Sequence, residues 1–146
     1  MTTKEYLEQL RQRDAIIRQK QELLDELEQK KFDVSAAQYT NAKSKTNDIT
    51  DRTADTIARI DQIKRQIQKE LDSYLNLFEQ ITKQINVLPD AAQRELLTLR
   101  YVKGLKWEEI ETTIGYEQRH CHRIHCKALQ EFDRIATSDA WGQFME

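Results

Sequence analysis

Apolar residues recur along the first part of the chain at the spacing of one face of a helix. Leu10, Ile17 and Leu24 follow one another every seven residues between Thr3 and about Phe32. This period predicts one long helix that carries a single apolar stripe. Two polar residues interrupt that stripe: Arg13 and Lys20.

A second and clearer pattern fills residues 57–88, where the spacing of the stripe alternates between three and four. It continues over more than four heptads with one polar break, at Lys64, and predicts a second long helix. The polar stretch at about 33–52 is typical of a connecting loop. We therefore expect an antiparallel hairpin over residues 1–88 that either buries its own seam or contributes it to a dimer. The members of the stripe are Ile57, Ile60, Lys64, Ile67, Leu71, Tyr74, Phe78, Ile81, Ile85 and Leu88.

The character of the chain changes at Pro89, which ends the second helix. Asp90 can cap a short helix, and Gly104 and Gly115 mark the ends of the next two. Three shorter helices with a glycine turn between the last two are typical of a helix-turn-helix, so we expect such a domain over 89–137 and a tail at 138–146. The predicted helices are Ala91 to about Lys103, Trp107 to Ile114, and about Glu117 to Ala136.

Composition supports an all-α chain and restricts its partners. Three Gly and one Pro in 146 residues are too few for the many turns of a β-sandwich or barrel. Lys and Arg number 23 against 25 Asp and Glu, a formal charge of −2, so nucleic acid could be held only by a local basic patch. No apolar run is long enough for a membrane span or a secretion signal, and the two cysteines fit reduced thiols. We expect a cytoplasmic protein without membrane contact.

The last predicted helix carries such a patch on one of its faces. One side is predicted to face the core through Cys121, Ile124, Ala128, Leu129 and Phe132. Between residues 118 and 127 the helix has three formal positive charges, three histidines and no acid, and the positive charges lie on the opposite side. Arg can bind guanine and Gln adenine through paired hydrogen bonds, while His can contact phosphate. The predicted DNA-binding residues are Gln118, Arg119, His120, His122, Arg123 and Lys127.

The same region also contains residues that could bind zinc or act as a nucleophile. Cys121 with His125, and His122 with Cys126, have the i, i+4 spacing of helical zinc ligands, but the two pairs point about 100° apart and cannot close around one ion. A Cys/His nucleophile lacks an orienting third group, so we expect neither an enzyme nor a cofactor. Trp107 is favoured as a core anchor over a stacking platform. The acidic residues Glu108, Glu109 and Glu111 suit the positive end of a helix dipole better than catalysis.

The run from residue 88 to residue 132 resembles region 4 of sigma-70-type factors. The shared features are a Leu-Pro start, a Leu-rich helix ending in Arg-Tyr, a glycine, a Glu-Glu-Ile helix and a final helix with Arg and Ala-Leu. The resemblance implies base-reading positions for Gln118, Arg119 and Arg123, with His120 and His122 near the backbone. Glu117 stands where that family has a Ser or Thr cap.

Nearly the whole chain also resembles small phage and prophage transcriptional regulators of the RinA and ArpU kind. The matching segments are KEYL at 4–7, WEEI at 107–110 and GY at 115–116. This resemblance implies activation of late phage genes, in some members of the family through promoter DNA.

These patterns together predict a transcriptional regulator that reads double-stranded promoter DNA with residues 117–136. The near-neutral charge favours a homo-oligomer, a dimer first of all, or help from host RNA polymerase. The alternative is a helical adaptor whose helix-turn-helix docks on host RNA polymerase or on phage packaging machinery. Trp141 and Phe144 of the tail could fold back or contact a partner.

Overall fold

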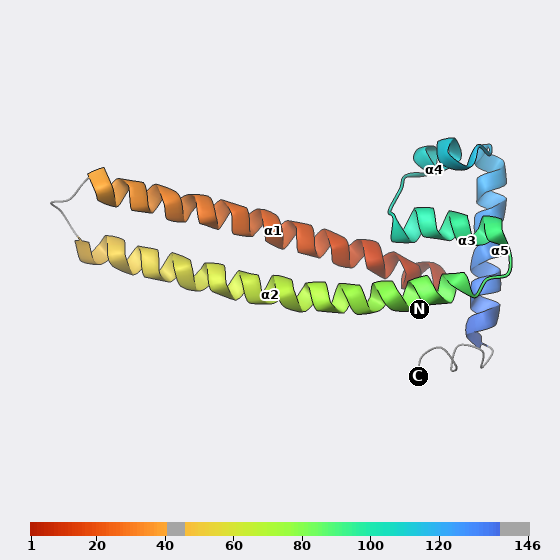
Figure 1. Ribbon diagram of the computed structural model, residues 1–146, viewed down its shortest axis with the longest axis horizontal. Coiled ribbons are helices and arrows are strands. Elements are labelled where there is room, and N and C mark those ends of the chain that lie inside the picture. The colour runs from red at the N-terminus through yellow and green to blue at the C-terminus, as the bar shows by residue number, and fades with distance from the viewer. Residues whose placement is uncertain (41–45, 138–146) are drawn as a thin grey trace. The chain divides into compact units, whose positions relative to one another are not determined.

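The structure, a computed structural model, describes residues 1–40 and 46–137, and the side chains of residues 1–33 and 51–137. These residues form helices joined by short turns, without any strand, and the prediction of an all-α fold is confirmed (Figure 1). The predicted tail at 138–146, with Trp141 and Phe144, lies outside the described residues. In chain order the elements are α1 (Thr3–Thr40), α2 (Thr46–Asn86), α3 (Ala91–Leu97), the π-helical turn η1 (Thr98–Val102), α4 (Trp107–Ile114) and α5 (Gln118–Thr137).

Helix covers most of the predicted loop at 33–52, which is a correction of the sequence analysis. The first helix continues to Thr40 and the second begins at Thr46. The residues between them, 41–45, lie outside the described part of the chain. Polar composition was the wrong signal here, because a helix can be polar on all sides. The stretch 33–52 contains neither Gly nor Pro, the two residues that interrupt helices most strongly.

Contacts divide the chain into two compact units, which we call the head and the arm. The head consists of Met1–Arg13 and Tyr74–Glu146, and the arm of Asp14–Ser73. The division therefore does not follow the boundary expected at residues 88 and 89. The first turns of α1 and the last turns of α2 belong to the head because their apolar side chains share one core with the C-terminal helices.

Within the arm, α1 and α2 run antiparallel. Lys20 Nζ of α1 lies 3.6 Å from Glu70 Oε1 of α2, and Glu28 Oε1 of α1 lies 3.8 Å from Lys64 Nζ of α2. The residue number increases along α1 while the number of the paired residue decreases along α2, as in an antiparallel pair. Both lysines are the polar residues that interrupt the apolar stripes of the two helices. The pair of Lys20 and Glu70 is about two-thirds buried, so a shifted register would leave these charges without their partners.

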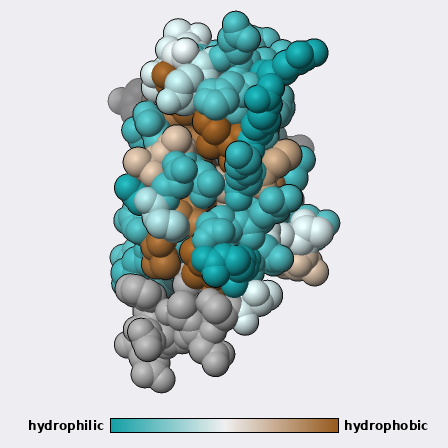
Figure 2. All heavy atoms as spheres, turned by 90° about the vertical axis from the view of Figure 1, so that its right-hand side faces the viewer, coloured by the Kyte–Doolittle hydropathy of each residue, from teal (hydrophilic) through white to brown (hydrophobic). Residues whose placement is uncertain are grey.

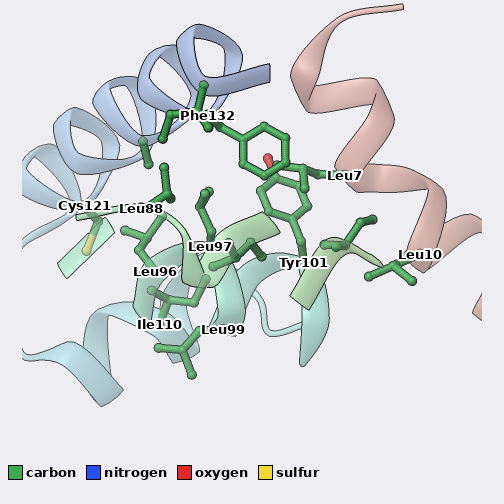
Figure 3. Packing of buried hydrophobic residues seen from close by; sticks show 14 of the residues in the cluster. Leu7, Leu10, Leu88, Leu96, Leu97, Leu99, Tyr101, Ile110, Cys121 and Phe132 are labelled. Atoms are coloured by element: carbon green, nitrogen blue, oxygen red, sulfur yellow. The ribbon is translucent and has the colours of Figure 1, made fainter. Parts of the chain in front are cut away.

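The core of the head joins all of its helices (Figure 3). Leu7 and Leu10 of α1 reach the same cluster as Tyr101 of η1 and Phe132 of α5, and all four are almost fully buried. The hydroxyl of Tyr6 donates to Gln84 Oε1 at 2.6 Å, which ties α1 to α2 at the edge of this core. Burial on this scale makes the start of α1 a structural part of the head. The cluster also contains Leu77, Ile81, Ile85, Leu88, Leu96, Leu97, Leu99, Ile110, Cys121, Ala128 and Ile135.

The predicted turn chemistry after Pro89 is confirmed. Asp90 Oδ1 accepts hydrogen bonds from the backbone N–H groups of Ala92 at 2.8 Å and Gln93 at 3.2 Å, as an N-cap does. Gly104 and Gly115 have φ of 69° and 80°, the left-handed region that a side chain would strain. The helix expected from Ala91 to about Lys103 is continuous in extent, but its last turn is π-helical rather than α-helical.

One polar pair lies inside the core of the head. The Oη of Tyr101 and the Nε2 of His125 are 2.7 Å apart, and His125 is only 7% exposed. Burial lowers the pKa of His125 to about 4, with a smaller contribution from the charge of Lys4. Burial likewise raises the pKa of Tyr101 to about 12, helped by the charge of Glu8. Both groups are therefore neutral at physiological pH and satisfy each other.

The burial of His125 predicts how stability depends on pH. Its folded-state pKa of about 4 lies below the unfolded value of 6.5, so the stabilisation is complete above pH 6.5 and is lost as the pH falls to 4. The loss from this residue is about 3 kcal/mol of unfolding free energy. Urea unfolding between pH 7 and pH 4 measures it. His125→Gln, which keeps a hydrogen-bonding side chain without the titration, should show a correspondingly flatter profile. Parallel profiles for the two proteins would contradict the assignment.

Candidate nucleic-acid interface

The helices α4 and α5 form a helix-turn-helix joined by residues 115–117. In Figure 1, α4 runs at a steep angle to α5 near the N-terminal end of α5. Ile110 of α4 and Cys121 of α5 are fully buried where the two helices pack. The N–H of Gly115 donates to the carbonyl of Glu111 at 2.8 Å, which closes α4, and α5 then begins at Gln118. This local geometry fixes which side of α5 faces the core.

The inner side of α5 matches the predicted core residues. Cys121, Ala128 and Phe132 are buried, and Ile124 and Leu129 pack partly buried against the same cluster. The prediction of this face is therefore confirmed. Sequence reasoning placed His125 only in a metal pair, although its spacing of four from Cys121 and seven from Phe132 put it on the buried side.

All six predicted DNA-binding residues are exposed on the outer side of α5. Five of them, all except His120, line one shallow depression of about 650 Å³. They form two columns with a spacing of four, which is the spacing of neighbours on a helix surface. Cys126 and Gln130 complete the lining and were missed, although the same spacing from His122 points to them. The columns are Gln118, His122, Cys126 and Gln130, and Arg119, Arg123 and Lys127.

The three cations of this face are not neutralised by any side chain that the structure describes. Among the described residues, Arg119, Arg123 and Lys127 take part in no ion pair. Arg134, further along the same helix, is paired with Glu131. The first turn of α5 contains no acidic residue, although the exposed Glu117 directly before it partly offsets the positive end of the helix dipole. Figure 2, which looks onto the side of the head where α5 lies, shows mainly hydrophilic side chains with smaller hydrophobic areas between them.

The two histidines of the patch are held by aromatic neighbours. The ring of His122 lies 4.9 Å from that of Trp107, and the ring of His120 lies 4.6 Å from that of Tyr116, edge to face. Both imidazoles remain exposed. Their positions are therefore set by packing, while the arginine and lysine side chains are not restrained in this way.

Trp107 is the packing centre between α4, η1 and α5. Its ring lies 4.8 Å from the ring of His125, and the guanidinium of Arg100 lies over it at 4.8 Å. Arg100 Nη1 also donates to the carbonyl of Leu105 at 3.0 Å. These contacts support the interpretation of Trp107 as an anchor of its helix over that of a free stacking platform.

The Cys and His pairs considered for zinc have other partners here. Cys121 is buried, its Sγ donates to the carbonyl of Tyr116 at 3.8 Å, and burial raises the pKa of its thiol. His125 is hydrogen-bonded to Tyr101. In the part of the chain that the structure describes, no three His, Cys, Asp or Glu side chains come together as metal ligands. Glu108 and Glu109 lie in the first turn of α4, where they complement its dipole.

Comparison with protein families, with characterised proteins and with solved structures found no match for this chain. Of the helices that the structure describes, none is both long and apolar enough to cross a membrane.

The contacts of Trp107 predict its role in stability. Trp107→Ala removes the ring that Arg100, His122 and His125 touch, so the free energy of unfolding should fall by about 2 kcal/mol, below the range for a fully buried Trp. Trp107→Phe keeps part of the packing and should lose less. Urea unfolding followed by circular dichroism measures both variants. An unchanged stability in Trp107→Ala would contradict the anchor role.

Proposed function

We propose that this protein is a transcriptional regulator that binds double-stranded promoter DNA in a sequence-specific manner. The observation that carries the proposal is the outer face of α5, where Arg119, Arg123 and Lys127 are exposed, aligned and without an ion-pair partner in the described structure. An α-helix fits the major groove, and the second helix of a helix-turn-helix presents its N-terminal residues to the base edges.

Each side chain of the face has a distinct role in this proposal. Arg119 and Arg123 can each make a bidentate contact with guanine, and Gln118 with adenine. Lys127 lies one turn beyond Arg123, towards the middle of the helix, and is assigned to phosphate. His122 is held against Trp107, and His120 against Tyr116, so we assign both to contacts with the sugar-phosphate backbone at the edge of the groove.

The small number of cations sets the strength of binding. Lys127 is the one of the three cations assigned to phosphate, and even all three together would give a salt dependence with a slope of only about −3 on logarithmic axes. Stable occupancy of a promoter then requires a second linked module, which a homodimer would supply, or help from host RNA polymerase. The resemblance to sigma region 4 and to phage regulators of the RinA and ArpU kind favours activation of late phage genes in the host cytoplasm.

Loss of the two arginines tests the proposal. Arg119→Ala and Arg123→Ala should each weaken binding to a duplex selected from a randomised library by about fivefold or more, since a bidentate contact contributes about 1–3 kcal/mol. Both side chains are exposed and unpaired within the described structure, so the melting temperature should stay within about 2 °C. Fluorescence anisotropy at 50 mM salt and thermal unfolding give the two readouts.

Arg59→Ala is the matched control, because Arg59 is an exposed arginine of the arm, paired only with Asp55 one turn away. It should leave DNA affinity unchanged. Wild-type affinity in both α5 variants would refute the recognition assignment. If the wild-type protein binds no duplex even at 50 mM salt, the alternative of a helical adaptor that docks on host RNA polymerase or packaging machinery is favoured.

A further inference from the structure

An exposed aromatic ring marks the beginning of the proposed recognition helix. Tyr116, in the turn before α5, is 41% exposed. Among the described side chains of the head, the other exposed large hydrophobic residues are Met1, at the start of the chain, and Leu75 on α2. Tyr116 is thus the single exposed Phe, Tyr or Trp among the described side chains of the head, and it lies two residues from Gln118 and three from Arg119.

The position of this ring is well defined. Gly115 before it adopts φ of 80° and turns the chain, and the carbonyl of Tyr116 accepts a hydrogen bond from Cys121 Sγ. The imidazole of His120 meets the ring at 4.6 Å and an interplanar angle of 78°. A surface ring that is already restrained by a backbone hydrogen bond and by a neighbouring ring loses little further conformational freedom when a ligand covers it.

The chemistry of the ring differs from that of the residues around it. Gln118, Arg119 and His120 offer hydrogen bonds and charge, whereas the phenyl ring of Tyr116 offers an apolar surface. In the major groove the C5-methyl group of thymine is the apolar feature that distinguishes one base pair from another. We propose that Tyr116 is a specificity-determining residue that contacts a thymine methyl group at the edge of the site read by α5. This proposal rests on the proposed function, and it adds thymine to the bases that the beginning of α5 recognises.

Replacing thymine by uracil tests the proposal, because the exchange removes only the methyl group. The probe is the duplex that the wild-type protein selects from a randomised 20-base-pair library. Each thymine of that duplex is changed to uracil in turn, and affinity is measured by fluorescence anisotropy. At one position we expect the wild-type protein to lose about fourfold in affinity, the value of one buried methyl group. Tyr116→Ala should bind the thymine duplex about fourfold more weakly and show no difference between thymine and uracil.

Tyr116→Phe is the matched control, since it keeps the ring and removes only the hydroxyl. It should keep the thymine preference of the wild-type protein. If Tyr116→Phe loses as much affinity as Tyr116→Ala while both keep the thymine preference, the residue contacts phosphate through its hydroxyl and the proposal is overturned. Equal thymine preference in wild type and Tyr116→Ala, or none in the wild type, would overturn it too. The proposed function itself survives those results and fails only if the wild-type protein selects no duplex.

Discussion

The burial of one side of α5 determines what its other side can do. Phe132, Ala128, His125 and Cys121 anchor the helix in a core that is built from five other elements, among them the first turns of α1. With that side fixed, the columns at a spacing of four that carry Arg119 and Arg123 must face solvent. The hydrogen bond between His125 and Tyr101 makes this orientation more specific, because any rotation of α5 would leave a polar group buried without a partner.

The same principle of paired polar groups operates in the arm. Lys20 and Lys64 interrupt apolar stripes, and each is paired across the hairpin with a glutamate. Among the described apolar side chains of the arm, Leu24 and Ile60 are buried and others, such as Ile17 and Ile67, are half-buried, so apolar packing also contributes to the alignment of the two helices. The more exposed pair of Lys64 and Glu28 stabilises weakly, and the largely buried pair of Lys20 and Glu70 contributes by specifying how the two helices align. A near-neutral arm also leaves the charge of α5 as the feature that would attract DNA.

Much of the fold could be predicted from the sequence, because its signals were local. The heptad stripes, the Asp90 cap and the two glycine turns each depend on neighbours within one or two turns, and the structure has them as expected. The contacts of α1 with the C-terminal helices could not be predicted, since Tyr6 and Phe132 are far apart in sequence and meet only in the folded core. The extent of the long helices was missed because polar composition was taken for a loop.

The candidate interface shows the same limit. Helical spacing correctly separated the inner and outer sides of α5, but it could not show that His120 and His122 lie against Tyr116 and Trp107. Those contacts come from the turn and from α4, and they decide which members of the patch have fixed positions. His125 was not predicted as a core residue because histidine is a polar residue that is usually considered as a ligand or a catalytic group. Its burial is explained by the hydrogen bond with Tyr101, which lies far away in the sequence.

The most direct test of the central claim is an NMR titration of the ¹⁵N-labelled full chain with its selected duplex at 50 mM salt. If the outer face of α5 reads DNA, the largest amide shift changes will fall within residues 116–127, while those of α1 and α2 in the arm stay small. Changes concentrated in the arm, or none with a duplex present in excess, would contradict the account.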